Sequence, residues 1–141
     1  MYQFFSNFNA SKKLYVTIVS PVCQKHALTQ MEFDVIMFLF NNSSFDTAKE
    51  IVEVRQIAKS HASLAIKSLE GRGLLRKEYR DGNKRTEHLV LTPESLAIGE
   101  EGRDAQKNFE TILMKGFSPE EMETMRSTMK RINENVRNYK V

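Results

Sequence analysis

The chain has 141 residues, of which 40% are hydrophobic, so it is long enough to bury a core without disulfides or a metal. Its one cysteine, Cys23, excludes an intrachain disulfide, and its longest apolar run, residues 35–40, is far shorter than the roughly 20 residues that span a bilayer. The net charge is +3, yet residues 55–85 hold nine basic and three acidic side chains, so this segment is either a solvated surface or a contact surface for an anionic partner.

The N-terminus, MYQFFSNFNASKK, shows no basic segment followed by an apolar stretch and a cleavage site, so we expect no secretory signal. We therefore expect a cytoplasmic protein that does not associate with a membrane.

Residues 1–25 are predicted to form an N-terminal helix. Side chains recur there at alternating spacings of four and three, and most of them are apolar, which indicates a helix with one partner-facing seam. The helix should end at Pro21 or shortly after it. The seam consists of Phe4, Phe8, Ser11, Tyr15, Ile18 and Val22.

Two capping boxes predict the starts of the next two helices. Thr29 and Glu32 stand three apart ahead of the apolar run MEFDVIMFLF. Thr47 and Glu50 repeat the arrangement ahead of a short helix over 48–55. We expect short helices packed close together, with the first of them largely buried.

A further helix is predicted within KSHASLAIKSLEGRGLL, ended by Gly71 or Gly73. Its apolar stripe is formed by Ala62, Ile66 and Leu69, at spacings of four and three. The opposite face should be exposed, unless Leu64 is a core residue and the helix is rotated. That opposite face carries Ser60, His61, Ser63, Leu64 and Lys67.

The stretch LLRKEYRDGNKRTEHLVLT indicates two strands around a turn at 81–83, because Asp-Gly tolerates the positive φ angles of a tight hairpin. After it, Thr92 and Pro93 begin a long helix, in which Gly99 and Gly102 either weaken the first half or permit close packing. Its apolar positions are Leu96, Phe109, Ile112 and Leu113.

The last helix is predicted to begin at Ser118, Pro119 and Glu121. Beyond this start, apolar residues alternate at spacings of three and four over about two and a half heptads. A methionine-rich stripe of this kind is either a ligand surface or a packing seam, and the spacing favours packing. The seam consists of Met122, Met125, Met129, Ile132, Val136 and Tyr139.

The order of these elements resembles the winged helix-turn-helix of the multiple-antibiotic-resistance-regulator (MarR) family. The likeness is strongest over 47–92, in TAKEIV, SHASLAIKSLEGRGLLRK and KRTEHLVLT, and covers the flanking helices by pattern only. The pair Glu50-Ile51 stands 23 positions ahead of Gly73-Leu74, as it does in the family.

One position departs from the family pattern. Asn83 stands where family members usually carry an aspartate that orients the arginine of the wing. Either Asp81 takes over this role, or the wing is looser than in the family.

The resemblance implies a mainly α fold with a small β-hairpin wing, a winged helix-turn-helix with N- and C-terminal dimerisation helices. Residues 1–141 would form a single domain, with a DNA-binding lobe at 29–92 and a helical dimerisation region made of 1–25 and 93–141.

The implied function is sequence-specific binding of double-stranded DNA by a transcriptional regulator. An exposed helix can read base edges in the major groove, where lysine and serine meet donors and acceptors and an apolar Leu64 meets a thymine methyl group. The basic tip of the wing would touch phosphates or the minor groove, unless it is a solvated turn. The predicted DNA-binding residues are Lys59, Ser60, His61, Ser63, Leu64, Lys67, Asn83, Lys84 and Arg85.

A homodimer would place two such helices about 34 to 36 Å apart on a palindromic operator. The resemblance further implies a repressor that releases DNA when a small, often aromatic, effector binds between the dimerisation helices and the lobe. The alternatives are DNA binding without an effector, and a winged-helix module that binds an acidic protein and no specific DNA. We assign the dimer interface to Phe4, Phe8, Tyr15, Ile18, Met129, Ile132 and Val136.

Signals for other chemistry are weak. Cys23 and His26 have a C-x-x-H spacing that suits two zinc ligands, and Cys23 alone would suit an oxidation sensor, but a buried structural cysteine is favoured. No nucleophile elbow, phosphate loop, HExxH helix or dinucleotide fingerprint is present. We expect no metal, no cofactor and no enzymatic activity.

Overall fold

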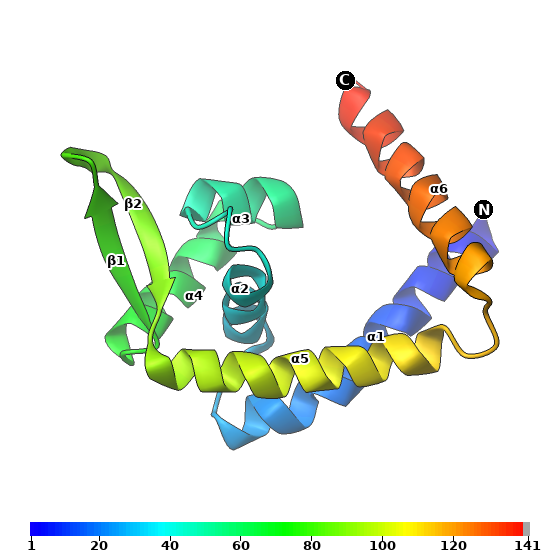
Figure 1. Cartoon of the computed structure of the whole chain (residues 1–141), viewed down its shortest axis with the longest axis horizontal. Helices are drawn as coiled ribbons and strands as arrows, with labels where there is room; N and C mark the ends of the chain where they lie inside the picture. The colour runs from blue at the N-terminus through cyan, green and yellow to red at the C-terminus, as the bar shows by residue number, and fades with distance from the viewer. Residues whose placement is uncertain (140–141) are drawn as a thin grey trace. The chain divides into compact units, whose positions relative to one another are not determined.

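The computed structural model describes residues 1–139 and contains six helices and one hairpin in that range (Figure 1). The chain divides into two compact units, one formed by residues 1–109 and the other beginning at residue 110. The elements are α1 (Tyr2–Lys25), α2 (Gln30–Asn41), α3 (Ala48–Arg55), α4 (Lys59–Gly71), β1 (Leu75–Arg80), β2 (Asn83–Leu91), α5 (Pro93–Leu113) and α6 (Pro119–Asn138).

Both predicted capping boxes and the predicted helix start at Ser118 are confirmed. Thr29 Oγ1 accepts a hydrogen bond from the Glu32 backbone N–H at 3.1 Å, and the Glu32 carboxylate accepts one from the Thr29 N–H at 3.2 Å. The same reciprocal pair forms at the start of α3 and at the start of α6. Each box satisfies backbone amides that the first helical turn leaves unpaired, which is why these starts were visible in the sequence.

The core of residues 1–109 brings together side chains from α1, α2, α4 and α5. Phe33 and Ile36 of α2, Leu69 of α4 and Ile98 of α5 are at most 1% exposed. Gly99 of α5 allows this packing, because a Cβ there would overlap the Phe40 ring. The glycines of this helix were expected either to weaken it or to permit close packing. At Gly99 the structure shows close packing.

The end of α4 is built around Gly73. Its φ of +70° places it in the left-handed region, which glycine adopts without strain. The Leu74 N–H donates to the Leu69 carbonyl at 2.9 Å, and the Gly73 N–H donates to the Glu70 carbonyl at 3.1 Å. This Schellman motif ends α4 and turns the chain into β1, with Leu74 buried.

The hairpin turn has two residues and not three. Asp81 and Gly82 both have positive φ, 54° and 70°, which defines a type I′ turn, and Asn83 is already in β2, paired with Arg80. The sequence interpretation was one residue too long, because asparagine is itself a common turn residue. The hairpin extends away from the helices (Figure 1).

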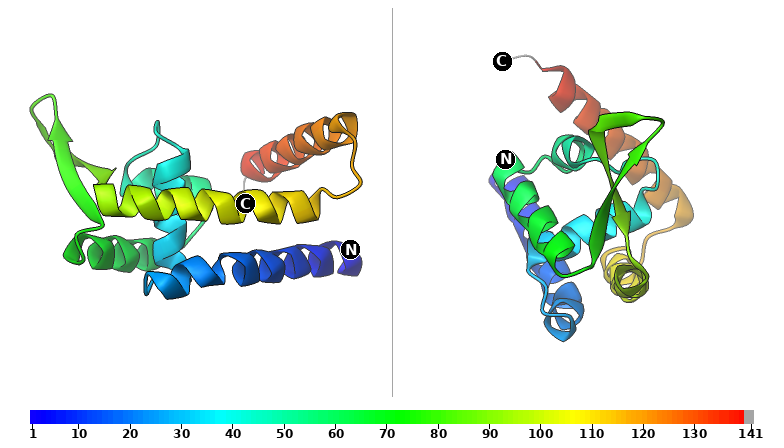
Figure 2. Two further views of the ribbon diagram at one scale, coloured as in Figure 1. Left: turned by 60° about the horizontal axis from the view of Figure 1, so that its bottom comes forward. Right: turned by 90° about the vertical axis from the view of Figure 1, so that its left-hand side faces the viewer.

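Helix α1 continues for four residues beyond Pro21 and lies alongside α5 (Figure 2). The Tyr15 ring packs edge-on against Phe109, with centroids 5.3 Å apart. Near the other end of this contact, Lys25 Nζ lies 2.9 Å from the Glu101 carboxylate. No helix within residues 1–139 combines the length and the apolar character needed to cross a membrane.

Helix α6 belongs to the second unit, and its predicted seam is only partly covered. Met122, Met125, Met129 and Ile132 are half-buried, whereas Val136 is 69% exposed. None of the described residues of α6 is fully buried.

Candidate nucleic-acid interface

The exposed face of α4 is the centre of the candidate site. Ala62, Ala65, Ile66 and Leu69 fill the opposite side of the helix and are each at most 5% exposed, so the predicted orientation of the helix is confirmed. Leu64 is not a core residue, since 69% of its surface is exposed. The outward side chains are Lys59, Ser60, His61, Ser63, Leu64 and Lys67.

The polar side chains on this face have no partner among residues 1–139. Neither the hydroxyls of Ser60 and Ser63 nor the His61 ring makes a hydrogen bond within that range. Ser68, one turn further along, contrasts with them, because its hydroxyl donates to Glu32 Oε1 at 2.7 Å. The face therefore presents donors and acceptors that are free to meet base edges.

The nine basic residues of 55–85 fall into two groups. Five of them have an acidic partner, with nitrogen–oxygen distances from 2.9 to 3.8 Å, so their charges are largely compensated. The other four make no ion pair with any residue in the described part of the chain, which leaves their charges available to an outside anion. These four are Lys59, Lys67, Lys84 and Arg85, all of them predicted DNA contacts.

Asn83 organises the backbone that carries the basic pair of the wing. Its side-chain oxygen accepts hydrogen bonds from the N–H groups of Arg85 at 2.9 Å and Thr86 at 3.3 Å. Its amide nitrogen donates to Thr86 Oγ1 at 3.1 Å. The Asp81 carboxylate makes no hydrogen bond or ion pair within residues 1–139, so it does not orient Arg85 there as the family's aspartate would.

The outer half of the hairpin is held by a cluster that sequence reasoning missed. The Asp46 carboxylate, in the loop before α3, lies 2.7 Å from His88 Nδ1 and 2.9 Å from the Arg80 guanidinium. The Leu89 N–H also donates to the Asp46 carbonyl at 2.7 Å. Burial alone would raise the pKa of Asp46, but the hydrogen bonds from His88 and Arg80 outweigh it and hold this pKa below its ordinary value.

A second missed cluster fixes the C-terminal end of α4. The Arg72 guanidinium donates to the backbone carbonyls of His26 at 2.7 Å and Ala27 at 2.8 Å, at the corner between α1 and α2. It also lies 3.4 Å from the buried Glu32 carboxylate, which accepts the Ser68 hydroxyl. Glu32 thus caps α2 and anchors α4, whereas the sequence indicated only the cap.

Comparison with solved structures identifies this arrangement. A Listeria monocytogenes transcriptional regulator assigned to the MarR family, in complex with a 26mer DNA, is 20% identical over 96% of this chain and 88% of its own, with a TM-score of 0.83. A MarR/EmrR family transcriptional regulator from Acinetobacter sp. ADP1 is 19% identical over 98% and 97%, with a TM-score of 0.81. The chain has the MarR-family winged-helix fold.

Staphylococcus aureus MarR, in complex with salicylate and kanamycin, is 24% identical over 99% of this chain and 93% of its own, with a TM-score of 0.76. The first two of these three proteins are transcriptional regulators. No protein-family model and no curated protein sequence matches the chain.

In this MarR fold, α4 and the hairpin occupy one end of the 1–109 unit, and the N-terminus of α1 lies at the other end (Figure 2). The N-terminal half of α1 exposes aromatic rings that were predicted to form a dimer interface. Phe4 and Phe8 are 46% and 47% exposed and pack edge-on against each other, with centroids 4.8 Å apart. Tyr15 and Ile18, from the same predicted seam, are half-buried within their own unit.

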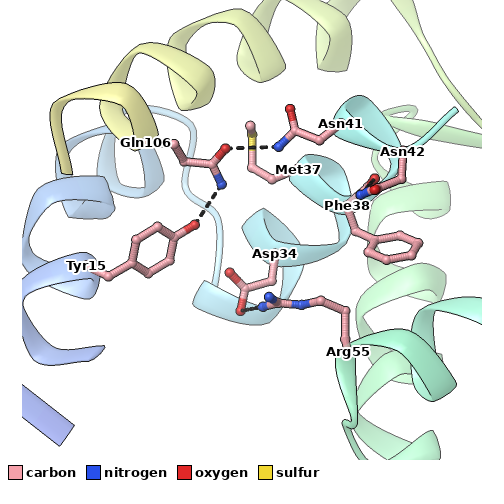
Figure 3. Close-up of a pocket in the computed structure, with 8 residues that line it drawn as sticks. All are labelled: Tyr15, Asp34, Met37, Phe38, Asn41, Asn42, Arg55 and Gln106. Carbon is pink, nitrogen blue, oxygen red and sulfur yellow. Dashed lines mark hydrogen bonds and ion pairs between the residues drawn. The ribbon is translucent and has the colours of Figure 1, made fainter. Parts of the chain in front are cut away.

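A cavity of about 110 Å³ lies between α1, α2, α3 and α5 of the MarR fold (Figure 3). On one side, the Gln106 amide donates to the Tyr15 hydroxyl at 2.9 Å and accepts from Asn41 at 3.0 Å. On the other, Arg55 lies 3.3 Å from the Asp34 carboxylate. Burial raises the pKa values of both Asp34 and Tyr15.

The geometry gives little support for a zinc site or an oxidation sensor at Cys23. Cys23 is 8% exposed and burial raises its thiol pKa, which is the opposite of what a reactive thiolate needs. His26 Nε2 lies 3.1 Å from Glu101, and no group of three or more metal-ligating side chains forms within residues 1–139.

Proposed function

We propose that this protein is a transcriptional regulator that binds specific sequences in double-stranded DNA through α4. The observation that carries the proposal is the outward face of α4, where Ser60, His61 and Ser63 have no internal partner within residues 1–139 and Lys59 and Lys67 have uncompensated charge. An α-helix fits the major groove, where every base pair presents a distinct set of donors and acceptors. The likeness to a regulator solved with a 26mer DNA supports the same conclusion.

The wing adds affinity more than sequence discrimination in this proposal. Lys84 and Arg85 lie beside the hairpin turn and have no acidic partner within residues 1–139. Side chains of this type contact phosphates or enter a narrow minor groove. Asn83 supports them by fixing the local backbone.

The proposed active form is a homodimer on a palindromic operator. Two recognition helices related by a twofold axis would reach half-sites one helical turn apart, roughly 34 to 36 Å. The exposed rings of Phe4 and Phe8 and the exposed Val136 are apolar surfaces that a second copy would cover. In this proposal, residues 29–92 form the DNA-binding lobe, and residues 1–25 and 93–141 form the dimerisation region.

The regulator is proposed to be a repressor that a small aromatic effector releases from DNA. The cavity between α1, α2, α3 and α5 joins the helices of the proposed dimerisation region to the first helix of the motif. Tyr15 supplies an aromatic wall, and Arg55 a cation that would exchange its ion pair with Asp34 for the anionic group of an effector. Staphylococcus aureus MarR was solved with salicylate, an aromatic acid of this class.

The test of the proposal is a selection of bound sequences from a random duplex pool. We expect enrichment of one palindromic sequence, with a binding constant that falls steeply as salt rises, because phosphate neutralisation releases counterions. Failure to enrich any sequence would reject specific DNA binding and favour the winged-helix module that binds a protein.

A thermal-shift measurement with salicylate tests the effector separately. A ligand that binds only the folded protein raises its melting temperature, by an amount that grows with ligand concentration. We expect this shift to be lost in Arg55→Ala, with Arg76→Ala as the control, because Arg76 does not line the cavity. Absence of a shift in the wild type would reject salicylate as the effector, while the proposal of DNA binding would still stand.

A further inference from the structure

We propose that Leu64 reads the C5 methyl group of one thymine in each half-site of the bound DNA. The inference rests on the proposed function, because it requires α4 to lie in the major groove. It goes further by naming the base and the atom that this helix recognises.

Leu64 is placed for contact with an outside partner, because most of its surface is exposed. It lies near the middle of α4 and is 69% exposed. The apolar stripe on the other side of the helix is complete without it, since Ala62, Ile66 and Leu69 are each at most 5% exposed. No rotation of α4 could bury Leu64 without exposing this stripe.

The surroundings of Leu64 favour DNA over an apolar protein surface. Residues three and four positions away are its neighbours on a helix, and here they are Ser60, His61, Lys67 and Ser68. The Ser68 hydroxyl already donates to Glu32, but the other three side chains have no partner within residues 1–139. A protein surface that covered Leu64 would also bury these three, and burial of unpaired polar groups is costly. The major groove supplies hydrogen-bonding groups for them and a methyl group at each thymine.

Side-chain length also fits this role. Ser60 and Ser63 are short, so they let the helix approach the base edges, while the longer Leu64 side chain projects from among them. Cations without partners within residues 1–139, Lys59 and Lys67, stand on both sides of Leu64 along the helix, where they would meet the flanking phosphates or guanines.

The experiment uses the full chain and the duplex recovered by selection from a random pool. Each thymine is replaced singly by deoxyuracil, which lacks only the C5 methyl group and keeps the donors and acceptors of the groove. Burial of one methyl group corresponds to about fourfold in affinity. We expect this loss at one thymine per half-site, and about 15-fold when both are replaced.

Three variants test whether Leu64 is the residue that contacts the thymine methyl group. Leu64→Ala should bind the thymine and deoxyuracil duplexes with equal affinity, whereas Leu64→Met should keep most of the difference because it retains an apolar side chain. Leu96→Ala, an exposed leucine of α5, is the matched control and should behave as the wild type. Circular dichroism and melting temperature should be unchanged in all three, since each substitution is at an exposed position.

Two results would overturn the inference while leaving the proposed function intact. One is a wild type that binds every deoxyuracil duplex as tightly as the thymine duplex. The other is a thymine preference that persists in Leu64→Ala. A selection that recovers no specific duplex would instead reject the proposed function itself, so the two failures can be told apart.

Discussion

At the scale of single residues, charge compensation separates basic side chains that hold the fold from those that face outward. Arg72 and Arg80 contact buried or half-buried carboxylates and act within the structure. Lys84 and Arg85 have no such partners within residues 1–139. A charge that is already paired has little to gain from a phosphate, so the second group should carry the salt dependence of DNA binding.

Arg85→Ala should therefore weaken binding to the selected duplex by about tenfold at low salt. It should also lower the slope of log affinity against log salt by about 1.8 for a dimer, because each lost phosphate contact contributes about 0.9. Lys77→Ala is the control, since Lys77 Nζ lies 3.1 Å from Glu87 and 3.7 Å from Glu70. An unchanged slope in Arg85→Ala would remove the wing from the interface.

At the scale of elements, two polar clusters fix α4 and the hairpin to the rest of residues 1–109. Arg72 and Glu32 join the end of α4 to the corner between α1 and α2. Asp46, in the loop before α3, joins the hairpin to this loop through His88 and Arg80. Both clusters use groups that are at least partly buried, so loss of one partner leaves another unsatisfied.

Arg72→Ala should lower the free energy of unfolding by about 1–3 kcal/mol, because it leaves the Glu32 carboxylate without its cation. Urea denaturation measures the change. Arg76→Ala is the matched control, because Arg76 is an exposed arginine whose distance to Glu78 is 3.8 Å. Equal stability of the two variants would contradict the anchoring role of Arg72.

The lowered pKa of Asp46 predicts an acid-sensitive wing anchor. A carboxyl with a lower pKa in the folded state than in the unfolded state stabilises the fold above the unfolded value of about 3.9, and this contribution is lost as pH falls through the folded value. The stability difference between wild type and Asp46→Asn should therefore be larger at about pH 6 than at about pH 3. A stability difference that stays constant over this pH range would contradict the anchoring role of the Asp46 carboxylate.

Most helix starts and the hairpin turn were predictable from the sequence, because the signals for them are local. The two side chains of each capping box are three positions apart, and Asp81-Gly82 marks its own turn. The two anchoring clusters were not predictable, because their partners are far apart in the chain. Arg72 and Glu32 are separated by 40 residues and His88 and Asp46 by 42, and no periodicity connects such pairs.

In the candidate site, too, local patterns were predictive and contacts between distant segments were not. The outward face of α4 was predicted correctly from the spacing of Ala62, Ile66 and Leu69, since one buried stripe determines which side of a helix is exposed. The cavity that includes Tyr15, Asp34 and Arg55 was not, because it gathers side chains from four separate helices.

At the scale of the whole molecule, the proposed binding to a palindromic operator requires two copies of α4. The exposed aromatic rings at the start of α1 are the apolar surface of residues 1–109 that a partner copy would cover in our proposal. A dimer also makes the contact area large enough for specific binding.

The double variant Phe4→Glu, Phe8→Glu should sediment as a monomer at micromolar concentration, whereas the wild type should sediment as a dimer. Charge at these positions would have to be buried in the interface, which is strongly unfavourable. Phe45→Glu is the control, because Phe45 is 42% exposed but lies outside the predicted interface. A wild type that is monomeric under these conditions would refute the dimer.

The most direct test of the central claim is a disulfide cross-link between α4 and the major groove. Ser63→Cys places a thiol on the exposed face of α4, and the wild type is the control because its single cysteine is buried. The selected duplex carries a thiol tethered either to the C5 position of a pyrimidine, in the major groove, or to the N2 position of a guanine, in the minor groove. We predict efficient cross-linking to the major-groove tether alone, and cross-linking only to the minor-groove tether, or to neither, would contradict the account.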